Sequence, residues 1–253
     1  MIGKLLPREA LSADDVSEMY ALFGNFFEGV SERRFRADLD EKQWIIRFTR
    51  GSALCGFSSL RFSRHIHREK RIAVLSSGDT IMAPEGRSTT VLARTWIDAV
   101  NQLRGIYGEP DLVWLLLVSG FRTYRLLPVF WQEFYPCYGR STPASVQEAM
   151  HSVASALFGA QYSPADGVVR FQEPQMLKPE HNGIPAARCG DPHVNFFVSR
   201  NPLHSQGDEL VCWARLSHEN LTEAGARMWH ATSGAPGMKH LGISGIGSAR
   251  VPV

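Results

Sequence analysis

The chain has 253 residues, 44% of them hydrophobic, and a formal net charge of +2 at pH 7. This much apolar material can fill a packed core, which excludes global disorder. The near-neutral charge gives no general electrostatic basis for binding nucleic acid, and the length suits one ordinary domain with a substantial extension.

Cysteine spacing and hydropathy set further limits. No two cysteines form a CxxC pair, so we expect reduced thiols in a cytoplasmic protein and no metal site. The first fifteen residues are too polar for a secretory signal peptide. The most apolar run, 112–120, is far shorter than the roughly 20 residues that span a bilayer, so we expect no membrane partner. His65 and His67 alternate in a basic segment, where a solvated turn is favoured over a metal site because no third ligand is evident.

Two helices are predicted first. Ser12 precedes two acidic residues and an apolar stripe that runs at spacings of three and four to Phe27, which predicts a helix with Ser12 as its N-cap. A second capped start at Ser31 predicts a short helix that ends near Lys42.

Strands are predicted next. The segments Trp44–Arg50 and Ala53–Ser63 are rich in β-branched and aromatic residues and read as a hairpin. Arg64–Lys70 reads as a turn, and Arg71–Pro84 as a long strand.

A strand–helix–strand unit completes the first half of the chain. After the strand we predict a helix over Ser88–Gly105 and a strand over Leu112–Ser119, whose continuous apolar run is typical of burial on both faces. This order predicts a right-handed βαβ unit, in which the helix N-terminus presents free N–H groups to an anion at the strand end. Arg122–Tyr135 is predicted as a helix interrupted by Pro128.

The residues after 142 are predicted to form further helices and strands outside the first domain. We predict a helix over Ser145–Gly159, a β-hairpin of His193–Pro202 with Glu209–Ser217, and a short helix over Asn220–Trp229. The predicted fold class is therefore α+β, a mostly antiparallel sheet flanked by helices with a C-terminal helix and hairpin extension. The predicted divisions are a first domain over 1–142, an extension over 143–233 and a flexible tail over 234–253.

The extension has two predicted uses. It completes or closes a pocket, or it extends the sheet or forms a homodimer contact. For the pocket, the polar contributors would be Asn195, Arg200, Asn201, His204 and Asp208.

From about Leu11 to Tyr138 the chain resembles the GNAT superfamily of acyl-CoA-dependent N-acyltransferases. In that family the strand equivalent to Arg71–Met82 leads into a pyrophosphate-binding loop and helix, and here Pro84 and Arg87 stand where a proline and an arginine are expected. Ser88, Thr89 and Thr90 replace the usual glycines, and their hydroxyl and N–H groups can still hold an anion. The resemblance implies that Ile81, Met82, Arg87, Ser88, Thr89 and Thr90 bind an acyl-CoA.

The resemblance also implies a proton acceptor on the strands and a proton donor near the last helix. Asp79 interrupts an apolar strand and is the predicted base, although a solvent-facing edge or a bulge at Gly78 explains it equally well. Tyr124 is the predicted acid, with core packing as its alternative, and Glu133 is a weaker candidate base.

Three functions are considered on this basis. The first is acyl transfer from a thioester donor, either acyl-CoA or an acyl-carrier protein, to a small-molecule amine. The second is a catalytically inactive GNAT-like module that binds a ligand or a protein. The third is a different reaction that uses His193 or His204. The sequence contains neither the G-x-S-x-G nor the H-E-x-x-H pattern of common hydrolases.

Overall fold

The computed structural model describes residues 1–84, 90–109 and 111–233. Within these ranges a nine-stranded sheet has the order β1-β3-β4-β5-β6-β11-β9-β8, and β7 also pairs with β11. The strands pair antiparallel except for β5 and β6, which are parallel and are joined through α3. The predicted α+β class, with a mostly antiparallel sheet flanked by helices, is confirmed.

The strands of the sheet are β1 (Ile2–Pro7), β3 (Trp44–Arg50), β4 (Ala53–His67), β5 (Lys70–Met82), β6 (Leu112–Val118), β7 (Phe134–Tyr135), β8 (Tyr162–Ser163), β9 (Val168–Val169) and β11 (Glu209–Arg215). A separate small ladder joins β2 (Phe27–Glu28) to β10 (Met176–Leu177). The α-helices are α1 (Ala13–Gly24), α2 (Glu32–Asp40), α3 (Val91–Tyr107), α4 (Phe121–Tyr124), α5 (Leu126–Phe130), α6 (Ala144–Phe158), α7 (Pro179–Asn182), α8 (Pro192–Arg200) and α9 (Glu223–Ser233). None of the helices in the described ranges has the length and hydropathy needed to cross a bilayer.

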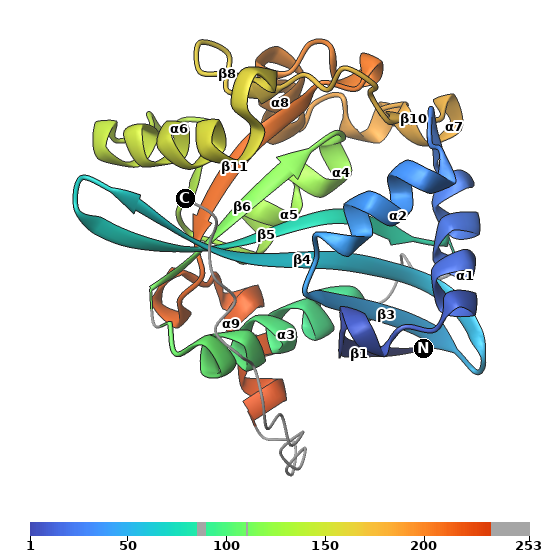
Figure 1. Ribbon diagram of the computed structural model, residues 1–253. Coiled ribbons are helices and arrows are strands. Elements are labelled where there is room, and N and C mark those ends of the chain that lie inside the picture. Colours follow the sequence, from blue (N-terminus) through green and yellow to red (C-terminus); the bar gives the residue numbers. More distant parts are fainter. Residues whose placement is uncertain (85–89, 110, 234–253) are drawn as a thin grey trace.

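Helices cover both faces of the sheet. In Figure 1, α2 and α6 lie above the sheet and α1 stands at its right-hand end, whereas α3 and α9 lie below the sheet. The buried side chains divide in the same way, because alternate residues of a strand point to opposite faces. Trp114 and Leu116 of β6 belong to the core that α3 covers, while Leu115 packs with residues of α6. The residues under α1 and α2 form a third cluster.

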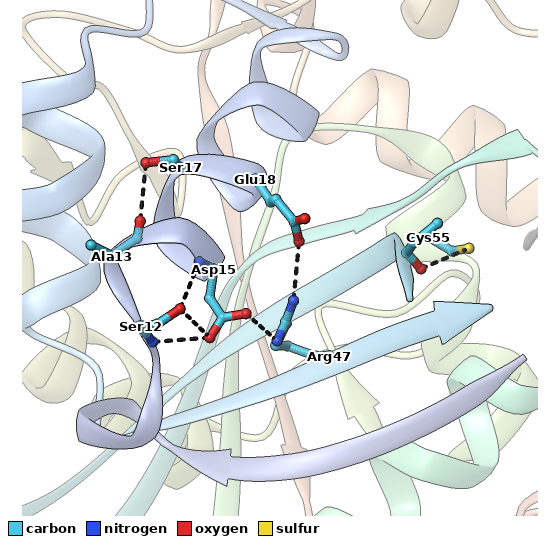
Figure 2. Close-up of polar contacts among 8 residues, drawn as sticks. Ser12, Ala13, Asp15, Ser17, Glu18, Arg47 and Cys55 are labelled. Carbon is cyan, nitrogen blue, oxygen red and sulfur yellow. Dashed lines mark hydrogen bonds and ion pairs between the residues drawn. The ribbon is translucent and has the colours of Figure 1, made fainter. Parts of the chain in front are cut away.

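The helix α1 is fixed to the sheet at its N-terminus. Ser12 and Asp15 form the predicted cap, since the Ser12 hydroxyl accepts from the Asp15 N–H and the Asp15 carboxylate accepts from the Ser12 N–H. Arg47 of β3 then pairs with Asp15 at 2.6 Å and with Glu18 at 3.3 Å, as Figure 2 shows. The hydrogen bond from the Ser12 N–H and the Arg47 charge hold the pKa of Asp15 below its usual value. The cap and the ion pairs therefore fix how α1 lies on β3.

Several predicted elements are confirmed, namely α1, α2, α6, β6 and β11. The predicted turn over 64–70 is too long, because β4 and β5 continue to a two-residue turn at Arg68 and Glu69, both with positive φ. The predicted helix over 122–135 is also wrong beyond residue 130, where the chain forms the short strand β7.

The predicted hairpin of 193–202 with 209–217 is wrong. Residues 192–200 form the helix α8, and β11 pairs instead with β6, β7 and β9. The Asp191 carboxylate accepts from the N–H groups of His193 and Val194, and Pro192 occupies the first turn, which together form a strong helix start. The division at 142/143 stays a prediction, and the tail over 234–253 lies outside the described residues.

Candidate functional site

The parallel strands β5 and β6 separate toward their carboxyl ends. The two strands pair with each other from Ala73 and Leu112 to Ser77 and Leu116. Beyond this point β5 continues to Met82 and β6 to Val118, but the two strands no longer pair with each other. A crevice at the carboxyl ends of parallel strands is a common ligand site, because loops and a helix N-terminus meet there. The helix α3 begins on this side of the sheet, after β5.

A β-bulge lies in β5 at the same point. Ser59 of β4 stands opposite Gly78 and Phe57 stands opposite Ile81, so β5 carries one residue more than β4 between them. Asp79 within this bulge has a φ of 46°, a conformation that non-glycine residues rarely adopt. The Ser59 hydroxyl donates to the Gly78 carbonyl at 3.1 Å and approaches Asp79 Oδ2 at 3.4 Å. Bulges re-aim side chains next to ligand sites, and this one turns Asp79 toward α2.

A cavity of about 700 Å³ occupies the space between the separating strands. Strand alternation divides its lining between the two faces of the sheet. The α2/α6 side carries carboxyl and basic groups together with apolar side chains, among them Arg34, Asp38, Glu41, Lys42, Arg61, Asp79, Leu115, Leu117, Leu157, Phe158, Phe171 and Glu209. The α3 side carries uncharged side chains, among them Thr80, Met82, Thr90, Leu92, Ala93, Leu116, Phe121, Leu126 and Phe130.

A narrower apolar crevice continues the α3 side. It has a volume of about 30 Å³, shares Thr80, Leu92 and Ala93 with the main cavity, and reaches Trp96, Trp114 and Trp131. The cavity therefore passes from a charged compartment on one face, through the gap between β5 and β6, to an uncharged compartment on the other.

Two half-buried carboxyl groups, Asp79 and Glu209, dominate the charged compartment. Burial raises the pKa of Glu209 to about 8, and the Asp79 charge adds to this rise while Arg34 and Lys42 oppose it. Burial also raises the pKa of Asp79, against the opposing charge of Lys42. A carboxyl group with a pKa of about 8, such as that of Glu209, exchanges protons near neutral pH, which is what a general acid or base requires.

The predicted site residues are only partly brought together. Asp79, Ile81, Met82 and Thr90 line the cavity. Arg87, Ser88 and Thr89 lie outside the described residues. Tyr124 and Glu133 are not among the lining residues.

Tyr124 lies in the core on α4, with its side chain fully buried. Its hydroxyl donates to the Pro136 carbonyl at 2.9 Å, and burial raises its pKa far above the usual value for tyrosine. This placement supports a structural role, and the catalytic role of Tyr124 stays a prediction without support from the cavity.

The segment 143–233 contributes side chains to the cavity, which is one of the two roles predicted for it. The residues that line the cavity are not the ones predicted. Asn195, Arg200, Asn201, His204 and Asp208 are absent from the lining, whereas Leu157, Phe158, Phe171 and Glu209 are present. Asn201 is buried and donates to the Asp208 carbonyl at 2.8 Å. Sequence reasoning missed Glu209, and its one signal is an acid at the first position of an otherwise apolar strand.

No family model and no curated protein matches the chain. Among solved structures, a probable N-acyltransferase from Enterococcus faecalis is 16% identical to this chain, with a TM-score of 0.42. The match covers 53% of this chain and 33% of the Enterococcus faecalis chain. The chain thus spans about a third of that protein. A GCN5-related N-acetyltransferase from Kribbella flavida is 11% identical with a TM-score of 0.40, covering 87% and 67%. A Trypanosoma brucei acetyltransferase is 14% identical with a TM-score of 0.36, covering 56% and 97%.

The low identities and TM-scores of these proteins do not carry an activity over to this chain.

Proposed function

We propose that the protein transfers an acyl group from a thioester donor, an acyl-CoA or an acyl-carrier protein, to an amine of a small molecule. The observation that carries the proposal is the cavity through the sheet, with one charged and one uncharged compartment joined between β5 and β6. Such a cavity suits two substrates that approach the same point from opposite faces.

The donor fits the α3 side. The backbone of β5 beyond Ser77 has no pairing with β6 and offers N–H and C=O groups to the amide groups of an extended pantetheine arm. Thr90 at the start of α3 lines the cavity, and a helix N-terminus attracts anions such as a pyrophosphate. Arg87, Ser88 and Thr89 remain predictions for this role from the sequence.

The acceptor fits the charged side, where Asp79 or Glu209 takes a proton from its ammonium group. The free amine then attacks the thioester carbonyl, so that a C–N bond forms and the C–S bond breaks. The departing thiolate takes the second proton of the nitrogen, through the same carboxyl groups or water, and the products are an amide and a thiol. No tyrosine or cysteine is among the lining residues described, and the proposal therefore gives both proton transfers to Asp79 and Glu209.

The same absence of a lining tyrosine favours a second candidate function, a module that binds a thioester or an amine without catalysis. Release of free thiol distinguishes the two functions, because only an enzyme produces it.

The test combines thermal shift with a thiol-release assay, using coenzyme A, acetyl-CoA and a longer acyl-CoA. We expect stabilisation by at least one thioester and amine-dependent release of thiol. Ala93→Phe fills the uncharged compartment and should abolish the stabilisation, whereas Ala156→Phe on the exposed part of α6 should not. Arg87→Ala tests the predicted phosphate contact in the same assay. Absence of both stabilisation and thiol release with every thioester would refute an acyl-CoA donor, and a carrier-protein donor would then be assayed in the same way.

A further inference from the structure

Ion pairs occupy some of the basic side chains of the charged compartment. Two of its basic side chains already have partners: Arg61 pairs with Glu41 at 2.7 Å, and Arg34 lies 3.6 Å from Glu173 and 3.8 Å from Asp38. These pairs leave the inner part of the compartment to the remaining charged groups.

Two carboxyl groups, Asp79 and Glu209, share one ammonium group there. Lys42 interacts electrostatically with Asp38, Asp79 and Glu209, and it forms no ion pair within 4 Å among the described residues. Arg122 also lines the cavity and donates to the His181 carbonyl at 2.6 Å, but it is not among the charges that act on the pKa of Asp79 or of Glu209. With Arg61 paired to Glu41 and Arg34 to Asp38, the inner part has one carboxylate more than Lys42 balances when Asp79 and Glu209 are both ionised.

Glu209 has the fewest partners of these groups. Its carboxyl group makes no hydrogen bond or ion pair with any residue that the structure describes, although it is half-buried and lines the cavity. An ionised carboxyl group is stable in such a place only with a cation beside it. Glu209 holds its proton near neutral pH while no cation lies beside it, and a ligand cation in the cavity would favour its ionised form.

Apolar side chains stand next to Glu209. It begins β11, which pairs with β6, so Glu209 shares its face with Leu117 and Leu115. Phe158 and Phe171 face each other edge to face at 6.4 Å and complete this wall. A ligand that reaches Glu209 therefore places its remaining atoms against leucine and phenylalanine side chains.

We infer that the acceptor, given the proposed acyl transfer, is a primary amine bound as its ammonium ion between Glu209, Asp79 and Asp38, with an apolar body and no carboxylate. A carboxylate on the ligand would lie beside Asp79 and Glu209, with Lys42 as the basic side chain that acts on both of them. An amino acid is therefore a poorer acceptor than the amine that lacks its carboxylate.

Calorimetry with three molecules of similar shape tests this: 2-phenylethylamine, phenylalanine and 2-phenylethanol, without any thioester. We expect 2-phenylethylamine to bind about tenfold more tightly than the other two, the difference that about 1.4 kcal/mol confers. Its affinity should rise from pH 6 to pH 8 as Glu209 ionises. The other charged or titratable groups of the cavity are Asp79, Asp38, Glu41, Lys42, Arg34, Arg61, Arg122 and His181.

Variants separate recognition from folding. Glu209→Gln, nearly the same shape, should reduce amine affinity about tenfold and leave binding of 2-phenylethanol unchanged. Glu148→Gln removes a carboxylate that pairs with Arg68 outside the cavity and should have no effect. Asp38→Asn, on the more exposed rim, should weaken amine binding less than Glu209→Gln does.

Equal binding of the amine and the alcohol, tighter binding of phenylalanine, an unchanged Glu209→Gln variant, or no amine binding would each overturn the inference. Failure of the proposed function looks different. The amine would then bind with the expected preferences, yet no thioester would yield amide.

Discussion

The indole Nε1 of Trp114 donates a hydrogen bond to Ser77 Oγ at 2.8 Å, where the pairing of β5 and β6 ends. Both residues are buried, and Trp114 also lines the narrow crevice below the cavity. The hydrogen bond joins the two strands just before they separate, so it limits how far the gap extends into the sheet.

Removal of this hydrogen bond should destabilise the protein. Trp114→Phe leaves the buried Ser77 hydroxyl without its donor and reduces ring contact with Trp96, so we expect a loss of about 1 to 3 kcal/mol. Urea unfolding measures this loss in the free energy of unfolding. The double variant with Ser77→Ala should lose less than the sum of the two single losses, and strict additivity would argue that the hydrogen bond contributes nothing.

Tyr124→Phe should separate a structural from a catalytic role. The variant leaves the Pro136 carbonyl without its donor, and we expect a loss of stability of about 1 kcal/mol. Because the hydroxyl lies outside the cavity lining, kcat for thiol release should stay within about twofold of the parent. A fall of about a hundredfold or more in kcat with normal stability would instead restore Tyr124 as the acid.

Local patterns allowed the elements near the cavity to be predicted, but not the way they meet. The apolar run of β6 indicates a strand buried on both faces, and Ser12 with Asp15 indicates the start of α1. Asp79 stands out as an acid in an apolar strand. Each of these signals lies within a few residues of the element that it predicts.

The contacts between distant segments could not be predicted in this way. Glu209 reaches Asp79 only because β11 pairs with β6, and no local pattern states which strand is its neighbour. The error over 193–202 has another cause, since the alternating apolar residues of α8 outweighed the capping signal of Asp191 and Pro192. Tyr124 failed as a cavity residue because chain position near a strand end does not say which way the ring points.

A substitution at Gly56 tests how closely β4 packs against β5 near the bulge. A Cβ at this position would lie 2.5 Å from the Ile81 carbonyl oxygen, a main-chain atom that can move only with β5. We expect Gly56→Ala to destabilise the protein by about 1 to 3 kcal/mol and to weaken ligand binding in the cavity. Gly105→Ala is the matched control, because its Cβ meets nothing within 4 Å and alanine favours a helix by about 0.5 to 1 kcal/mol. Urea unfolding should show opposite signs for the two variants.

Glu209 should make stability fall as pH rises. Because burial raises its folded-state pKa to about 8 from 4.5, the folded protein holds this proton over a pH range in which the unfolded chain has lost it. The contribution of Glu209 is therefore fully present below pH 4.5 and is lost as pH rises to about 8, by about 1.4 kcal/mol for each unit of pKa difference.

Glu209→Gln removes this dependence, since glutamine has no proton to lose. We expect the variant to gain stability over the parent progressively from pH 5 to pH 8.5, with the gain levelling off above the pKa of Glu209. Urea unfolding at a series of pH values measures the difference, and Glu148→Gln, outside the cavity, should show a pH-independent difference. A constant difference for Glu209→Gln as well would mean that Glu209 ionises as readily in the folded as in the unfolded protein, and would remove the basis for its role as proton acceptor.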